Sequence, residues 1–189
     1  THFSILDSFG NAVAITTTLN GRFGSKVFVH GAGFLLNNEM DDFSAKPGVP
    51  NQFGLLGDSA NAIQPGKRML SSMTPTIVCK NNKSVLITGS PGGATIITSI
   101  LQNILQTLVY NISLKDALAS PRFHHQWYPD KIYLEQEWKL NATTINSLQK
   151  AGYPIQYRDL IGRVDAILID KNIFYGGGDP RGDDIAAGY

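Results

Sequence analysis

Cysteine and charge are both scarce in this sequence of 189 residues. The single cysteine, Cys79, excludes an internal disulfide framework and any metal site built from several cysteines, although it leaves the compartment open. Charged residues make up 16% of the chain and the formal net charge is +1, which gives no electrostatic footprint for nucleic acid or an anionic membrane. No apolar run approaches the roughly 18 residues that a membrane span needs.

The chain does have enough apolar residues and enough length for a substantial core. Its hydrophobic content is 42%, which excludes a disordered chain, and the length favours one domain. The sequence opens at Thr1, with neither an initiator Met nor a signal region, and leads at once into strand-like residues. Two explanations remain open at this point, a trimmed chain or the C-terminal product of a processed precursor, and composition alone favours trimming.

The periodicity of the chain predicts an α+β layered fold without internal repeats or linkers. Residues 37–72 show little regular periodicity, and so long a stretch inside a domain is usually functional or disordered. The helix that follows Gly93 is so apolar that we expect it to be buried against a sheet. The expected strands are 2–7, 12–18, 34–36, 76–79, 85–88, 164–170 and 173–175, with turns at 8–11, 80–83 and 171–172; the expected helices are 96–108, 113–120 and 141–151.

A glycine-rich loop, Gly89-Ser90-Pro91-Gly92-Gly93, lies between a predicted strand and that helix. Backbone N–H groups at such a helix start favour a phosphate, a carboxylate or an oxyanion. The loop lacks the Lys-Ser/Thr of a phosphate-binding P-loop and the full dinucleotide spacing, so nucleotide binding is disfavoured. Alone, the loop is best explained as a tight turn; as an oxyanion hole, it would use the N–H groups of Gly92 and Gly93.

An acidic cluster, Asn37-Asn38-Glu39-Met40-Asp41-Asp42, packs three carboxylates and two amides into six residues. Acceptors this dense suit a substrate ammonium group or a cation, although the spacing is not that of an EF-hand. A solvated turn is the usual explanation of such a cluster. The paired hydroxyls of Ser71 and Ser72 are likewise explained by a simple turn when taken alone.

Three further features carry less weight. His124 and His125 are adjacent, so they face different ways and cannot easily share a metal; we interpret them as packing or hydrogen-bonding residues. The Arg181-Gly182-Asp183 tripeptide matches an adhesion motif but is too short to be specific. The glycosylation sequons at Asn82, Asn111 and Asn141 matter only in a glycosylating compartment.

Taken together, the motifs resemble the small subunit of gamma-glutamyltransferase (gamma-glutamyl transpeptidase), over essentially the whole chain. The resemblance also accounts for the abrupt start, because members cut their own precursor and the new N-terminal threonine becomes the nucleophile. It implies the four-layer αββα fold of N-terminal-nucleophile hydrolases. The segments that carry it are Thr1-His2-Phe3-Ser4, Gly10-Asn11-Ala12-Val13, residues 36–44, Lys67-Arg68-Met69-Leu70-Ser71-Ser72-Met73, Gly89-Ser90-Pro91-Gly92-Gly93, Pro121-Arg122-Phe123-His124 and Asp179-Pro180-Arg181.

The resemblance implies an acyl-transfer mechanism without metal or cofactor. The threonine, with its α-amine as base, would attack the γ-amide of glutathione and form a γ-glutamyl ester, which water or an amino-acid or dipeptide acceptor then resolves. Gly92 and Gly93 would hold the oxyanion and Thr18 would hydrogen-bond the nucleophile. The donor α-carboxylate would bind Ser71, Ser72 and an arginine of the partner subunit. Its α-ammonium would bind Asn20, Glu39 and Asp42.

The sequence departs from the family pattern at two places. Members read threonine, any residue, histidine at the start, whereas His2 here follows Thr1 directly. The family register therefore places the nucleophile one residue before Thr1, and Thr1 takes that role only if the subunit starts there. In the lid loop, residues 47–57, the usual tyrosine is Phe53, which keeps the apolar cover but loses a hydroxyl that could bond Asn20.

Partners, location and rivals also follow from the resemblance. Residues 1–189 should form one small-subunit chain that completes its fold with a large subunit from the same precursor, in the periplasm or outside the cell. The rival enzymes are a poly-γ-glutamate depolymerase and an acylase relative, and the rival from another class is a non-catalytic binding subunit. The long lid and the Ser71-Ser72 and Asp42 set favour a free γ-glutamyl donor over a polymer.

Overall fold

The computed structural model describes residues 1–137, 139–171 and 173–188. Its contacts divide the chain into two compact units, which are described separately. The first unit comprises residues 1–16 and 73–189, and the second comprises residues 17–72.

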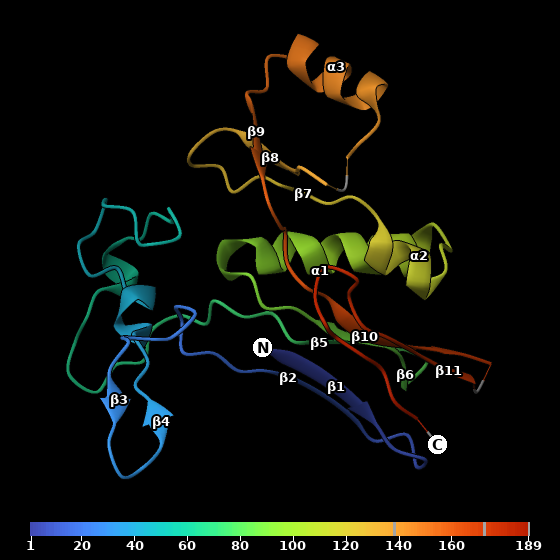
Figure 1. Cartoon of the computed structure of the whole chain (residues 1–189), viewed down its shortest axis with the longest axis horizontal. Coiled ribbons are helices and arrows are strands. Elements are labelled where there is room, and N and C mark those ends of the chain that lie inside the picture. Colours follow the sequence, from blue (N-terminus) through green and yellow to red (C-terminus); the bar gives the residue numbers. More distant parts are fainter. Residues whose placement is uncertain (138, 172, 189) are drawn as a thin grey trace. The chain divides into compact units, whose positions relative to one another are not determined.

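Two stacked sheets form the centre of the first unit (Figure 1). One is a hairpin of β1 (His2–Leu6) and β2 (Ala12–Thr16), with His2 opposite Thr16. The other has the order β11-β10-β6-β5 and is antiparallel throughout. Its strands are β5 (Thr76–Lys80), β6 (Lys83–Gly89), β10 (Asp165–Asp170) and β11 (Ile173–Gly177).

A helical layer covers the opposite face of the four-stranded sheet (Figure 1). It contains η3 (Gly93–Thr95), α1 (Ile96–Ile104), a π-helical turn η4 (Leu105–Val109) and α2 (Leu114–Ala119). Ile96 and Ile100 of α1 pack on Leu86 of the sheet. The expected burial of this helix against a sheet is confirmed on this side, whereas Ile97 and Leu101, on the other side of α1, are 63% and 52% exposed.

A smaller sheet with the order β7-β8-β9 completes the first unit. Its strands are β7 (Phe123–His124), β8 (Ile132–Glu135) and β9 (Ile155–Arg158), and α3 (Ala142–Lys150) connects the parallel pair β8 and β9. The side chain of Asn141 caps α3 by accepting a hydrogen bond from the Thr144 amide. The sequence analysis predicted α3 but missed all three strands, which are short and lack clear alternation.

An ionic cluster of Arg122, Glu135, Asp179 and Arg181 is buried in the first unit, each residue being at most 8% exposed. Arg181 donates to both Glu135 carboxylate oxygens at 2.6 Å, and Arg122 pairs with Asp179 at 2.6 Å. Remaining donors and acceptors meet the backbone: the Leu118 carbonyl accepts from both arginines, and Asp179 accepts from the Val164 amide. The cluster therefore ties the end of α2, β8 and the C-terminal segment together with every charge paired.

Irregular backbone makes up most of the second unit. Its regular elements are the short strands β3 (Phe28–Val29) and β4 (Phe34–Leu35) and two 3₁₀ helices, η1 (Glu39–Asp42) and η2 (Ser59–Asn61). Hydrogen bonds from side chains connect segments that no β-sheet joins. For example, the Asn61 side chain donates to the Asp42 carbonyl at 2.7 Å and accepts from the Leu70 amide at 3.0 Å. The prediction of little regular structure across residues 37–72 is confirmed.

Most predicted element boundaries agree with the structure to within two residues. Ser113 caps α2 through the Asp116 amide, as the sequence pattern predicts. The second strand of the first hairpin ends at Thr16 rather than residue 18, and β4 ends at Leu35. The predicted turn at Lys171-Asn172 lies partly outside the described residues. Across the described ranges no helix is long and apolar enough to cross a membrane.

Candidate active site

The glycine-rich loop continues directly from β6 in the first unit. The strand ends at Gly89, and Gly92 and Gly93 have φ values of 143° and 58°, a region that favours glycine. Within the described residues, no hydrogen bond uses the Gly92 or Gly93 amide. Two adjacent N–H groups are thus available to a negatively charged oxygen.

The loop lies against the start of the first strand. A Cβ atom at Gly89 would overlap the His2 imidazole, so this position requires glycine for the close approach of β6 and β1. His2 donates or accepts hydrogen bonds with Thr16 Oγ1 at 2.8 Å and Ser4 Oγ at 3.1 Å. Burial, followed by the adjacent ammonium group, lowers the pKa of His2 to about 4, so its imidazole is neutral at pH 7.

Thr1 immediately precedes β1 and is exposed. With Thr1 as the terminal residue, partial burial of its α-amine, followed by the Arg163 guanidinium, lowers the pKa of that amine. A lower pKa increases the fraction of neutral amine, the form that can accept a proton from a hydroxyl. Because Gly89 lies against His2, the amino-terminal end of β1, with Thr1, is next to the glycine-rich loop.

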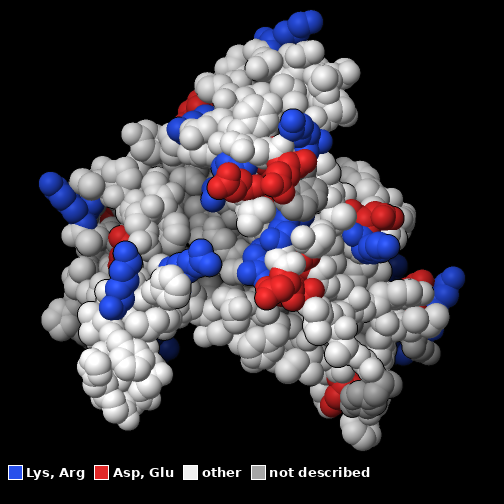
Figure 2. Space-filling model, viewed as in Figure 1, with Lys and Arg blue, Asp and Glu red and all other residues white. Residues whose placement is uncertain are grey.

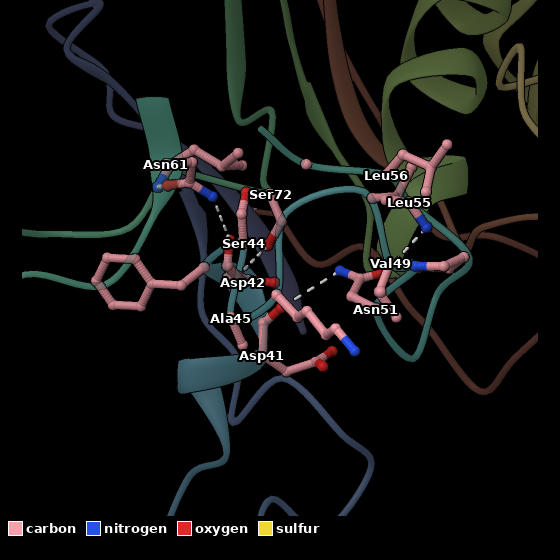
Figure 3. Close-up of a pocket in the computed structure, with 15 residues that line it drawn as sticks. Asp41, Asp42, Ser44, Ala45, Val49, Asn51, Leu55, Leu56, Asn61 and Ser72 are labelled. Atoms are coloured by element: carbon pink, nitrogen blue, oxygen red, sulfur yellow. Dashed lines mark hydrogen bonds between the residues drawn. The ribbon is translucent and has the colours of Figure 1, made fainter. Parts of the chain in front are cut away.

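The acidic cluster folds into η1 in the second unit. Asp42 is 7% exposed, and its carboxylate accepts a hydrogen bond from Ser72 Oγ at 2.7 Å (Figure 3). The Asp42 backbone is fixed as well, because its carbonyl accepts from Asn61. The structure thus brings together Asp42 and Ser72, which are 30 residues apart in the sequence.

Glu39 and Asp42 form what we call the open carboxylate pair. The Glu39 Oε1 atom is buried and has no hydrogen-bond partner within the described part of the chain. Desolvation, followed by the charge of Asp42 and a hydrogen bond to it, raises the pKa of Glu39. Because a buried acceptor without a donor is costly, the pair is suited to receive a ligand that is positively charged and rich in hydrogen-bond donors.

A cavity of about 160 Å³ is lined by Asp42 of this pair (Figure 3). The lid loop contributes Val49, Asn51 and Leu55 to its wall, opposite Asp42 and Ser72. The Asn51 side chain accepts from the amides of Phe53 and Leu55 and donates to the Asp41 carbonyl, which fastens the lid loop to η1. The lid loop is therefore an ordered wall of the cavity.

The remaining predicted site residues of the second unit lie around the same polar network. The Thr18 hydroxyl accepts from the Asn20 amide at 2.9 Å, and Asn20 Nδ2 donates to the Asn38 carbonyl at 3.1 Å. Ser71 is exposed, whereas Phe53 is half-buried in the lid loop. The roles of these four residues toward a substrate stay predictions.

Sequence reasoning gave no role to Ser44, which the structure places in the same cavity. Ser44 is 7% exposed, and its hydroxyl has no hydrogen-bond partner in the described ranges. A Cβ at Gly57 of the lid loop would overlap this hydroxyl, so the two residues are in close approach. Ser44 belongs to the segment 36–44 that carried the resemblance, which was the available signal.

The interpretation of His124 and His125 as hydrogen-bonding residues is confirmed. His124 is buried between Thr98 Oγ1 and Gln126 Oε1, each at 2.8 Å, and His125 pairs with Asp130. The described residues contain no group of three or more metal-ligating side chains. The Arg181 side chain is fully buried, so the tripeptide cannot be displayed as an adhesion motif.

Charged side chains of both signs are interspersed on the face shown in Figure 2, and most of that face is uncharged. The described residues on this face therefore form no extended surface of one sign. The open carboxylate pair stands out by its burial and its unmet acceptor rather than by a surrounding field.

Comparison with known proteins gives one consistent answer. The profile of the family described as gamma-glutamyltranspeptidase matches residues 1–189. A glutathione hydrolase proenzyme of Escherichia coli (strain K12) is 47% identical over 191 residues, covering 100% of this chain and 33% of the relative. One from Pseudomonas aeruginosa is 50% identical over 184 residues, covering 96% and 33%. The chain thus spans about a third of the length of these curated relatives.

The solved structures agree with the sequence relatives. The gamma-glutamyltranspeptidase from Pseudomonas nitroreducens complexed with L-DON superimposes with a TM-score of 0.96 at 46% identity, covering 100% of this chain and 99% of that one. This likeness confirms the predicted α+β fold of the N-terminal-nucleophile hydrolase type. The chain belongs to the gamma-glutamyltranspeptidase family.

Proposed function

We propose that this chain is the small subunit of a gamma-glutamyltransferase that hydrolyses glutathione and related γ-glutamyl compounds and transfers their γ-glutamyl group. The observation that carries the proposal is the open carboxylate pair, in which a buried Glu39 oxygen has no hydrogen-bond donor in the described ranges and Asp42 lines the lid-loop cavity. Family membership over the whole chain supports the same assignment. No metal or cofactor is required by the chemistry.

The donor would be held at both of its charged ends. Glu39, Asp42 and Asn20 accept the α-ammonium, with Asp42 held in place by Ser72. The hydroxyls of Ser71 and Ser72 bind the α-carboxylate together with an arginine of the partner subunit, and the Ser72 proton, which is donated to Asp42 in the structure, turns to the carboxylate when the donor binds. Fixing both ends leaves the γ-carbonyl as the free end of the donor, and such positioning contributes several kcal/mol to catalysis.

The reaction would then proceed through an ester. The N-terminal threonine hydroxyl, Thr1 or the residue that the family register places before it, attacks the γ-carbonyl as the α-amine takes its proton. Thr18 hydrogen-bonds that hydroxyl, and Gly92 and Gly93 donate to the oxyanion. Collapse releases the amine of the donor and leaves a γ-glutamyl ester. Water converts the ester to glutamate, or an amino acid or dipeptide takes the γ-glutamyl group.

A large subunit from the same precursor would complete the fold. Support comes from the outer face of the first hairpin, where Phe3, Ile5, Val13 and Ile15 are 39–50% exposed although all four are apolar. The first unit contains one helical and two sheet layers, and covering this face would supply the fourth layer. We place the complete protein in the periplasm or outside the cell, by analogy with lid-bearing bacterial members.

The test is incubation of the processed heterodimer with a chromogenic γ-glutamyl anilide, followed by intact mass of the small chain. Dye release with a γ-glutamyl adduct on the N-terminal threonine supports the proposal and identifies which threonine reacts. A cleaved, folded heterodimer that releases no dye would contradict it. Activity on poly-γ-glutamate or on an acylated β-lactam would then identify the protein as one of the rival enzymes. Absence of activity on both would favour the non-catalytic binding subunit.

A further inference from the structure

Two hydroxyl groups hold the backbone of the glycine-rich loop from the side opposite its free amides. Ser90 Oγ donates to the Pro91 carbonyl at 2.6 Å, and Thr95 Oγ1 donates to the Gly92 carbonyl at 2.9 Å. The Thr95 amide reaches the same Gly92 carbonyl at 3.2 Å. Ser90 and Thr95 are 0% and 1% exposed, so water does not compete for these carbonyls.

Because a peptide group is planar, a hydrogen bond that fixes a carbonyl also fixes the direction of the N–H group that follows it. The Pro91–Gly92 and Gly92–Gly93 peptides are trans, and in a planar trans peptide the C=O and the following N–H point in opposite directions. A bond that fixes the Pro91 carbonyl therefore fixes the Gly92 N–H, and one that fixes the Gly92 carbonyl fixes the Gly93 N–H. Both amides that would meet the oxyanion are held in this way.

Both hydroxyls act on the carbonyl side of the loop. Thr95 ends η3, has helical dihedral angles and leads directly into α1, so its side chain caps no helix start and donates three residues back, to the Gly92 carbonyl. Ser90 Oγ accepts from the Arg163 amide at 2.8 Å, which commits the Ser90 proton to the Pro91 carbonyl. Glycine at positions 92 and 93 would otherwise let these peptides rotate.

We propose that Thr95 and Ser90 are positioning residues that aim the Gly92 and Gly93 amides at the developing oxyanion. The inference rests on the proposed function, because it concerns the same acyl-transfer step. Thr95 carries the test, since removing the Ser90 hydroxyl would also leave the buried Arg163 amide without an acceptor. Removing an oxyanion donor outright costs about 10²–10³ in rate, and we expect a displaced donor to cost about 10–100-fold.

The experiment compares three variants of the processed heterodimer with the wild type. Thr95→Val removes the hydroxyl and keeps the β-branched shape, whereas Thr95→Ser keeps the hydroxyl. Thr98→Val is the control, because it removes a hydroxyl that lies one turn further along α1 and hydrogen-bonds His124. The readouts are kcat/KM for a γ-glutamyl anilide, with the cleaved fraction from intact mass, and the Ki of L-glutamate, which reports donor binding without chemistry.

We expect Thr95→Val to lower kcat/KM by about 10–100-fold while the Ki of L-glutamate changes less than about twofold. Thr95→Ser should restore most of the rate, and Thr98→Val should leave kcat/KM near that of the wild type. If Thr95→Val does not mature, Thr95→Ala carries the same expectation. If the wild type is active, this proposal alone would be overturned by a Thr95→Val variant that is equally active, or by one in which the Ki of L-glutamate rises by as much as kcat/KM falls. An inactive wild type would overturn the proposed function with it.

Discussion

The ionic cluster of the first unit and the open carboxylate pair of the second each contain two carboxylates with buried oxygen atoms, yet they differ in how many hydrogen-bond donors those oxygens receive. Glu135 and Asp179 receive donors on every carboxylate oxygen from two arginines and from backbone amides. Glu39 has a buried oxygen without any donor in the described ranges. The carboxylate oxygens of the ionic cluster already have donors and are not available to a ligand, whereas the open carboxylate pair has an acceptor that a cationic ligand can fill.

The largest effect is expected from breaking the saturated cluster. Arg181→Met leaves Glu135 and Asp179 buried with too few donors, and removing one partner of a buried ion pair costs about 3–5 kcal/mol. We expect the free energy of unfolding of the processed heterodimer, measured in urea, to fall by that amount, or the soluble yield to be lost.

A matched control lies nearby in the sequence. Arg163 pairs with Asp183 and Asp184, but its side chain is 36% exposed. Arg163→Met should cost less than about 1 kcal/mol, because exposed ion pairs contribute little. Equal losses in the two variants would show that burial and saturation do not distinguish the two sets of charges.

The next effect concerns the open pair. Asp42→Asn removes the charge that we propose binds the donor ammonium but keeps an acceptor for Ser72, and charged hydrogen bonds contribute about 1.5–3 kcal/mol. We expect the Ki of L-glutamate to rise by about 10–150-fold with the unfolding free energy nearly unchanged. Asp58→Asn, an exposed carboxylate of the same unit, should leave the Ki unaltered. A large loss of stability in Asp42→Asn would place it with the ionic cluster instead.

A smaller effect is expected at Glu39, and it depends on pH. Because burial raises the Glu39 pKa, L-glutamate must displace a proton to bind, so affinity should rise as pH increases through that pKa. The native chain also holds a proton that the unfolded chain has released, so stability should fall over the same range. Glu39→Gln should flatten both profiles and weaken binding by about tenfold. Unchanged profiles in this variant would assign the titration to another group.

The smallest effect is expected in the lid loop that borders the open pair. Phe53→Tyr adds a hydroxyl within a unit where Asn20 already anchors the backbone at Asn38. One added hydrogen bond of about 1 kcal/mol should slow opening of residues 47–57 by a few-fold in hydrogen exchange. Equal exchange in the two proteins would refute the idea that phenylalanine holds the lid less firmly.

Sequence reasoning succeeded where local signals were strong. The helix that Ser113 begins, the helix of residues 141–151, the hairpins and the glycine-rich loop all follow from short-range chemistry. The ionic cluster was not foreseen, because it joins residues up to 63 positions apart through tertiary contacts. The residue pattern alone, without the family resemblance that named Asp42, does not separate Asp42 from Asp41, which is half-buried and accepts a hydrogen bond from the Gln52 amide. Which carboxylate of a cluster is left unsatisfied depends on packing.

The most direct test of the central claim compares a γ-glutamyl anilide with the corresponding glutaryl anilide, which lacks only the α-amino group. If the open carboxylate pair binds that group, the wild-type heterodimer should prefer the γ-glutamyl donor in kcat/KM by about 100-fold or more, and Asp42→Asn should lose most of the preference. A preference that is absent in the wild type, or that survives intact in Asp42→Asn, would contradict the account.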